Sequence, residues 1–123
     1  MIEVNEYVRT KDGIIGVFDR YSSRKEKSLY KSPFNCFIKI KNRKTPLQCC
    51  EDYIVKHSKQ LIDLVEVGDY VNGKLIHKID KGSNYCYLYY GNCKTFVDYQ
   101  IKTILTHEQF EANCYKVGGE DEC

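Results

Sequence analysis

Short runs of apolar and aromatic residues alternate with turns containing glycine or asparagine along most of this chain. Residues 7–9 and 14–18 are two such runs on either side of Asp12-Gly13, and an Asp-Gly pair between β-prone segments predicts a hairpin. Farther along, the second half of residues 34–41 alternates isoleucine with lysine. This period of two predicts a half-buried strand whose isoleucines point inward and whose lysines face water.

The later part of the chain repeats this pattern with more closely spaced turns. Residues 85–90, Tyr-Cys-Tyr-Leu-Tyr-Tyr, are strongly β-prone, and residues 95–99 with 101–105 predict a further strand or two. Turns are expected at Gly68-Asp69, Asn72-Gly73, residues 82–84 and Gly91-Asn92. Together these segments predict a β-meander.

The clearest helix signal comes after residue 105. Thr106 and Gln109 have the spacing of a capping box, so a short helix that begins after Thr106 and ends near Asn113 is expected. Residues 51–60 are ambiguous, because a strand at residues 53–55 and an irregular helical turn near residues 58–61 both fit the sequence.

The composition agrees with a β-rich chain, since 123 residues include 11 Tyr and 5 Phe but only two Pro. We predict a β-rich fold, all-β or α+β, in which a small SH3-like barrel of curled sheets carries one short C-terminal helix. The length fits a single compact domain over residues 1–117, or two small sub-modules that meet near residues 58–68. Residues 118–123 form an acidic tail that is expected to fray.

The cysteines are interpreted through the compartment that the sequence indicates. Charge begins at Glu3, and no stretch is apolar enough for a signal peptide or a membrane span, so we expect a cytoplasmic protein. In a reducing cytoplasm the seven cysteines are expected to be free thiols. No C-x2-C pair is present, so we expect no metal and no cofactor, with a zinc site assembled from scattered Cys and His residues as the alternative.

Positive charge is concentrated in residues 20–44, which contain nine Lys and Arg residues and only one acid, Glu26. This basic segment has a charge of +8, and because the whole chain has +2, the remainder has 2 minus 8, or −6. Such a segment fits an acidic protein surface or a phosphate backbone, but a solvated loop beside a lysine-protected edge strand gives the same pattern. The basic residues predicted to contact a partner are Arg24, Lys25, Lys27, Lys39, Lys41, Arg43 and Lys44.

The tyrosine-rich run offers a second candidate surface. Alternation places Tyr85, Tyr87 and Tyr89 on one face of a strand and the intervening residues on the other face, and one of the two must belong to the core. If the tyrosines point outward, their rings are suited to stacking on a nucleotide base or to anchoring a protein partner. Ordinary cross-strand aromatic packing is the alternative.

Catalytic residue types are present, but their arrangement in the sequence does not indicate an enzyme. His57-Ser58, with Asp52 and Cys50 nearby, contains the side chains of a nucleophile and a base. Close neighbours on an extended chain seldom converge, and catalytic triads are defined by geometry. We therefore assign no catalytic residue and expect a protein without enzymatic activity.

Three stretches carry a resemblance to a known group: residues 54–73 (IVKHSKQLIDLVEVGDYVNG), residues 101–111 (IKTILTHEQFE) with Tyr115-Lys116-Val117, and residues 5–10. They resemble small uncharacterised proteins encoded by phages and prophages of clostridia and related Gram-positive bacteria. The resemblance covers about a third of the chain and contains no catalytic motif.

The resemblance implies an accessory phage function, and small phage proteins of this size resemble inhibitors of host immunity such as anti-CRISPR proteins. The first hypothesis is a non-enzymatic inhibitor of a host antiviral defence system that binds a defence nuclease. Its activity is predicted to depend on the basic segment, with the tyrosines as the competing contact. The alternatives are a binder that sequesters a defence nucleotide signal and a nucleic-acid-binding accessory protein. The expected partner is a host protein or a nucleotide in the cytoplasm, and not a membrane.

Overall fold

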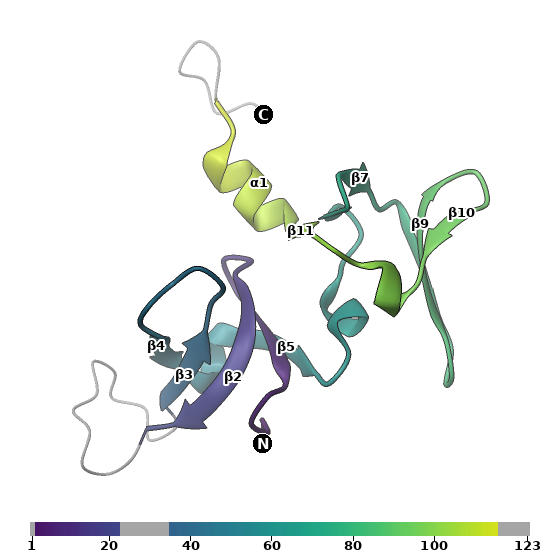
Figure 1. Ribbon diagram of the computed structural model, residues 1–123. Helices are drawn as coiled ribbons and strands as arrows, with labels where there is room; N and C mark the ends of the chain where they lie inside the picture. The colour runs from purple at the N-terminus through teal and green to yellow at the C-terminus, as the bar shows by residue number, and fades with distance from the viewer. Residues whose placement is uncertain (1, 23–34, 116–123) are drawn as a thin grey trace. The chain divides into compact units, whose positions relative to one another are not determined.

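A computed structural model describes residues 2–22 and 35–115 (Figure 1). The chain divides into two compact units, Met1–Leu64 (unit 1) and Val65–Cys123 (unit 2). The described residues contain eleven strands, three short 3₁₀ helices and one α-helix, so the predicted β-rich fold with one short helix is confirmed. Arg24, Lys25 and Lys27, together with the tail at residues 118–123, lie outside the described residues.

Unit 1 is built on an antiparallel sheet of five strands in the order β4-β3-β2-β1-β5. These strands are β1 (Tyr7–Thr10), β2 (Ile15–Tyr21), β3 (Asn35–Lys39), β4 (Leu47–Cys50) and β5 (Ile54–Ser58). The ambiguous residues 51–60 divide into the 3₁₀ helix η1 (Glu51–Tyr53) and the strand β5, and η2 (Leu61–Leu64) follows. Within residues 2–22 and 35–64 the edge strands β4 and β5 are not paired with each other, so this sheet is not closed into a barrel.

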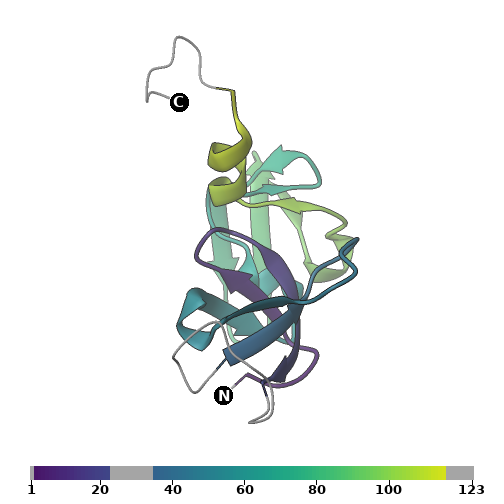
Figure 2. The same ribbon diagram turned by 90° about the vertical axis from the view of Figure 1, so that its left-hand side faces the viewer.

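The hairpin predicted at Asp12-Gly13 is confirmed, since β1 pairs with β2 and Gly13 has a positive φ of 81°. Strand β2 bends strongly along its length, as Figures 1 and 2 show, and its pairing with β3 shifts register between Phe18 and Arg20. A Cβ atom on Gly16 would lie 2.5 Å from Cγ2 of Ile38 and 2.7 Å from the Lys39 carbonyl oxygen. Glycine at position 16 therefore allows β2 and β3 to approach closely.

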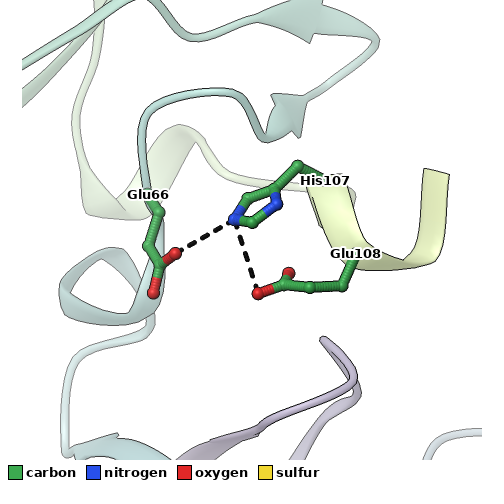
Figure 3. Close-up of side chains that lie close together, drawn as sticks. All are labelled: Glu66, His107 and Glu108. Carbon is green, nitrogen blue, oxygen red and sulfur yellow. Dashed lines mark hydrogen bonds and ion pairs between the residues drawn. The ribbon is translucent and has the colours of Figure 1, made fainter. Parts of the chain in front are cut away.

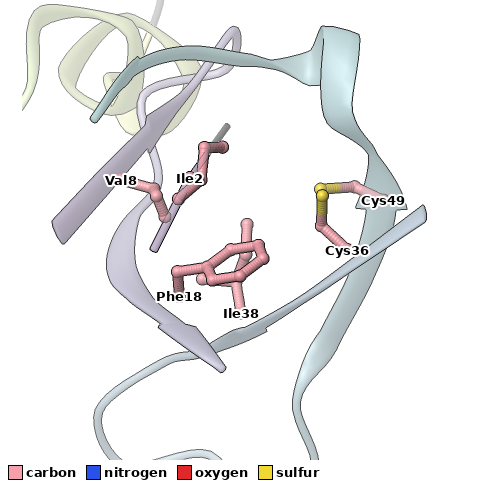
Figure 4. Packing of buried hydrophobic residues seen from close by; sticks show 6 residues of the cluster. All are labelled: Ile2, Val8, Phe18, Cys36, Ile38 and Cys49. Atoms are coloured by element: carbon pink, nitrogen blue, oxygen red, sulfur yellow. The ribbon is translucent and has the colours of Figure 1, made fainter. Parts of the chain in front are cut away.

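The core of unit 1 is formed by buried side chains from the first four strands and from the segment before β1. Its members, shown in Figure 4, are Ile2, Val8, Phe18, Cys36, Ile38 and Cys49. Ile38 is buried whereas Lys39 is exposed, as the alternation of this segment predicts. Cys36 and Cys49 lie opposite each other in the β3–β4 register, and burial raises the pKa of Cys36 to about 12 and that of Cys49 to about 11.

Unit 2 contains two three-stranded antiparallel sheets, in the orders β11-β6-β7 and β10-β9-β8. Its elements are β6 (Tyr70–Val71), β7 (Lys74–Leu75), β8 (Lys78–Lys81), β9 (Cys86–Gly91), β10 (Lys94–Phe96), η3 (Asp98–Gln100), β11 (Ile104–Leu105) and α1 (His107–Asn113). The prediction of a strand over residues 95–99 is wrong at its C-terminal end, because β10 stops at Phe96. The Gln100 side-chain oxygen accepts a hydrogen bond from the Val97 N–H at 2.9 Å, which supports the helical turn η3 instead.

Two predictions made from short sequence motifs in unit 2, a turn and a helix cap, are confirmed. Asn72 and Gly73, with positive φ values of 52° and 79°, form the two-residue turn between β6 and β7. The Thr106 hydroxyl accepts a hydrogen bond from the Gln109 N–H at 3.3 Å and caps α1 as predicted. No helix within the described residues has the length and apolar composition needed to cross a lipid bilayer.

The burial of Cys36 and Cys49 predicts their reactivity. At pH 8 these two thiols should react with Ellman's reagent far more slowly than Cys93, which is exposed, because burial both blocks access and keeps the thiols protonated. Peptide mapping after timed alkylation identifies each site. In denaturant without reductant all seven thiols should titrate. Rapid labelling of Cys36 in the folded protein, or fewer than seven thiols in denaturant, would contradict this prediction.

Candidate functional site

Strand β9 presents tyrosine side chains on its outward face. Leu88 is completely buried on the other face, where it is paired with Ile79 of β8 and Phe96 of β10. Tyr87 is 38% exposed, and Tyr85, just before the strand, is 48% exposed. Leu88 therefore belongs to the interior of unit 2, and the odd-numbered tyrosines form an outward row.

We call this surface the tyrosine face and define it as Tyr85, Tyr87, Tyr89, Lys78 and Asp80. The ring centroids of Tyr85 and Tyr87 are 5.5 Å apart, with the ring planes inclined at 31°. Lys78 Nζ lies 5.2 Å from the centroid of the Tyr89 ring, within the range of a cation–π contact. In the β8–β9 register Lys78 is opposite Tyr89 and Asp80 is opposite Tyr87. The face therefore combines aromatic surface with one cation and one carboxylate.

The described members of the basic segment lie in unit 1. Lys39 ends β3, and its Nζ is 3.5 Å from Oδ1 of Asp19, so part of its charge is balanced within the unit. Lys41, Arg43 and Lys44 are exposed in the connection from β3 to β4. The basic residues thus belong to unit 1 and the tyrosine face belongs to unit 2, so neither unit carries both.

The alternative interpretation of the lysines as protection for an edge strand is wrong for Lys39. Strand β3 lies inside the sheet, with β2 on one side and β4 on the other. The edge strands are β4 and β5. The chain turns at residues 40–43, and β4 then pairs with the free side of β3, which places β3 inside the sheet. The sequence alternation identified the strand but carried no information about its position in the sheet.

A third group of polar side chains, which the sequence did not single out, converges at the start of α1 (Figure 3). Nε2 of His107 lies 3.1 Å from Oε1 of Glu66 and 3.4 Å from Oε2 of Glu108. These side chains are partly exposed, between 25% and 37%. Throughout residues 2–22 and 35–115, this is the one group of three metal-ligating side chains whose ligand atoms lie within 4.8 Å of one another.

Asp69 holds the backbone on both sides of this group. Its Oδ2 accepts a hydrogen bond from the Glu66 N–H at 2.7 Å, and its Oδ1 accepts one from the His107 N–H at 2.9 Å. Asp69 is completely buried, and the capping residue Thr106 is almost completely buried. The carboxylate therefore ties the turn that carries Glu66 to the first turn of the helix that carries His107.

Sequence reasoning had no means of finding this group. Glu66 and His107 are 41 residues apart, and the predicted helix start places only His107 and Glu108 next to each other. No cysteine belongs to the group. The site considered from scattered cysteines and histidines is therefore not the one that the described residues bring together.

The catalytic residue types around His57 do not form a triad. Nδ1 of His57 lies 3.1 Å from Oε1 of Glu6, whereas the Ser58 hydroxyl donates to Oδ2 of Asp63 at 2.6 Å. The imidazole and the hydroxyl thus have separate partners, although both border an open polar depression of about 510 Å³ in unit 1. Hydrogen bonds from the Glu3 N–H and from His57 hold the pKa of the buried Glu6 carboxyl below its ordinary value.

No family model, curated protein or solved structure matches this chain. The choice between functions therefore rests on the geometry of three surfaces. The tyrosine face has the chemistry of a binding surface, the exposed lysines and arginine of unit 1 can attract anionic groups, and the group around His107 offers one nitrogen and two carboxylates as ligands.

Removing the Asp69 carboxylate should destabilise unit 2. Asp69→Ala is expected to lower the free energy of unfolding by about 2 to 3 kcal/mol, because two backbone N–H groups lose a buried acceptor. Urea unfolding followed by circular dichroism measures the change. Glu111→Ala, an exposed substitution on α1, is the control and should stay within about 0.5 kcal/mol of wild type. Equal effects of the two substitutions would contradict the bridging role of Asp69.

The lowered pKa of Glu6 predicts a pH dependence of stability. Its ordinary value is 4.5, and the folded-state pKa lies below this, so the carboxylate stabilises the fold above pH 4.5 and loses this contribution as the pH falls through the folded-state value. Glu6→Gln should therefore be less stable than wild type at pH 7, and the difference should shrink in acid. The control is Glu3→Gln, which keeps the Glu3 N–H and changes an exposed side chain. A stability difference that does not change with pH would exclude this explanation.

Proposed function

We propose that this chain is a non-enzymatic interaction protein that binds a host antiviral defence protein through the tyrosine face. The observation that carries the proposal is the outward, mutually packed pair of Tyr87 on β9 and Tyr85 just before it, with Leu88 buried on the other face of the strand. An exposed row of aromatic rings is unusual on a surface that faces only water, and such rings are enriched at protein interfaces.

Tyrosine is well suited to such a contact. Each ring contributes a large amphipathic surface while only two side-chain torsions become ordered on binding. The contact between Tyr85 and Tyr87 restricts both side chains before a partner arrives, which lowers the entropy lost on association. Lys78 and Asp80 add one charge of each sign to the same face and favour a partner with the complementary pattern.

The anti-defence role in this proposal rests on the resemblance of residues 54–73 and 101–111 to phage proteins. It implies action in the host cytoplasm against a nuclease of an immune system such as CRISPR. Lys41, Arg43 and Lys44, which are exposed in unit 1, provide a second contact for an acidic surface. We also propose that unit 1 has an SH3-like fold, and the order of its five strands, with the first and last paired, supports this assignment.

A binder of a nucleotide signal is the second candidate function, favoured by the contact of Lys78 with Tyr89. A base would stack on an exposed tyrosine ring while the Lys78 ammonium meets a phosphate. A nucleic-acid-binding accessory protein is the third candidate, and it would depend on the basic residues of unit 1 and on salt concentration.

The tyrosine pair should be needed for inhibition of host defence. In bacteria whose CRISPR nuclease destroys a targeted plasmid, the wild-type chain should restore plasmid transformation, and Tyr85→Ala with Tyr87→Ala should reduce this effect at least about tenfold. Tyr99→Ala is the matched control, because Tyr99 is 85% exposed in η3 and lies outside the tyrosine face. Thermal unfolding of each purified variant verifies that the fold is retained.

Three further results distinguish the candidates. Normal activity of the tyrosine variant, combined with lost activity of Lys39→Glu, Lys41→Glu, Arg43→Glu and Lys44→Glu together, would move the contact to the basic segment. Quenching of tyrosine fluorescence by a cyclic nucleotide, readable because the chain has no Trp, would favour the nucleotide binder. Continued plasmid destruction in the presence of the wild-type chain would reject inhibition of the tested nuclease.

A further inference from the structure

We propose that Glu66, His107 and Glu108 form a binding site for one divalent transition-metal ion of the Zn²⁺ class (Figure 3). The site shares no residue with the tyrosine face, so the inference does not depend on the proposed function. One imidazole nitrogen and two carboxylate oxygens are ligands that zinc and the neighbouring first-row metals accept. Three protein ligands leave a coordination position for water, as in zinc sites that remain open to solvent.

The distances between the ligand atoms fit a coordination polyhedron. Zinc binds nitrogen and oxygen at about 2.0 to 2.2 Å, which places neighbouring ligands of a tetrahedral ion about 3.4 Å apart. Nε2 of His107 is 3.1 Å from the Glu66 oxygen and 3.4 Å from the Glu108 oxygen. All three ligand atoms lie within 4.8 Å of one another, which is close to the spacing that a shared ion requires.

Both carboxylates approach the same ring atom, so one ion bound among the three ligand atoms would contact all three side chains. Figure 3 shows Glu66 from the turn and Glu108 from α1 both directed at Nε2 of His107. An imidazole nitrogen carries at most one hydrogen, which cannot point at two oxygens in good geometry. A cation among the three atoms would attract both carboxylates and accept the nitrogen lone pair. The competing arrangement is a metal-free pairing of protonated His107 with the two acids.

The backbone around the site is held in place by a residue that is not itself a ligand. The buried carboxylate of Asp69 accepts hydrogen bonds from the N–H groups of Glu66 and His107. Gly68, with φ of 100°, lies beside the His107 ring: a Cβ atom on Gly68 would be 3.7 Å from Cβ and 3.9 Å from Cγ of His107. The backbone that carries Glu66 and His107 is therefore held in position before an ion binds, which reduces the entropy lost on binding.

Titration of the full chain with Co²⁺ tests the site. Co²⁺ replaces zinc in such sites, and its absorption spectrum distinguishes nitrogen and oxygen ligands from the thiolates that seven cysteines could supply. We expect one Co²⁺ per chain, visible absorption bands without a sulfur-to-metal charge-transfer band in the near ultraviolet, and displacement of Co²⁺ by Zn²⁺.

Substitution of each ligand then locates the ion. Glu66→Gln, His107→Gln and Glu108→Gln keep side-chain size and should each weaken Co²⁺ binding at least about tenfold. His77→Gln and Glu111→Gln are matched controls, because both residues are exposed in unit 2 and lie outside the site. These controls should bind as wild type does. Circular dichroism of every variant identifies any that fails to fold, and three independent ligand substitutions keep the test decisive.

The opposite results would overturn the proposal. These are absence of saturable Co²⁺ binding to the wild-type chain, a thiolate charge-transfer band as the sole signal, or equal affinity of folded ligand variants and controls. In each of these cases the group is an imidazole with two acidic neighbours and has no metal.

Discussion

The buried carboxylate of Asp69 is the interaction that joins the segments around β6, β7 and the start of α1 in unit 2. A buried charged group is tolerated only when its oxygens accept hydrogen bonds, and here each oxygen accepts one from a different segment. The backbone of Asp69 is also held, since its carbonyl oxygen accepts a hydrogen bond from the N–H of the buried Ile76 at 2.9 Å. The turn before β6, the chain after β7 and the start of α1 therefore meet at one residue, and the positions of Glu66 and His107 follow from it.

The tyrosine face depends on a different constraint, the central position of β9 in its sheet. Strands β8 and β10 occupy both hydrogen-bonding edges of β9, so only the two faces of the strand remain for contacts. Burial of Leu88 and stacking of Tyr90 on Phe96, with ring centroids 4.2 Å apart, settle which face points inward. A strand held in this way presents its outward side chains more rigidly than a loop would, which suits a binding surface.

The two units carry different chemistry. Unit 1 provides the exposed basic residues around the β3–β4 turn and the pairing of Glu6 with His57. Unit 2 provides the tyrosine face and the group around His107, which share no residue and are supported by separate structural features. Binding of a partner and binding of a metal are therefore properties that substitutions can separate.

The sequence by itself determined the features that depend on a few neighbouring residues. The turns at Asp12-Gly13 and Asn72-Gly73 and the cap at Thr106 could be predicted because backbone preferences and short-range hydrogen bonds decide them. Alternation likewise predicted the strands, including the one that contains Tyr87, but not their neighbours, so the interior place of β3 was missed. The early end of β10 was missed for a local reason, because the hydrogen bond from the Val97 N–H to the Gln100 side chain supports the helical turn η3 there. Tertiary structure alone decided that Glu66 meets His107 and that Glu6 meets His57. These partners are 41 and 51 residues apart, and no local preference acts over such distances, because only packing of the folded chain brings them together.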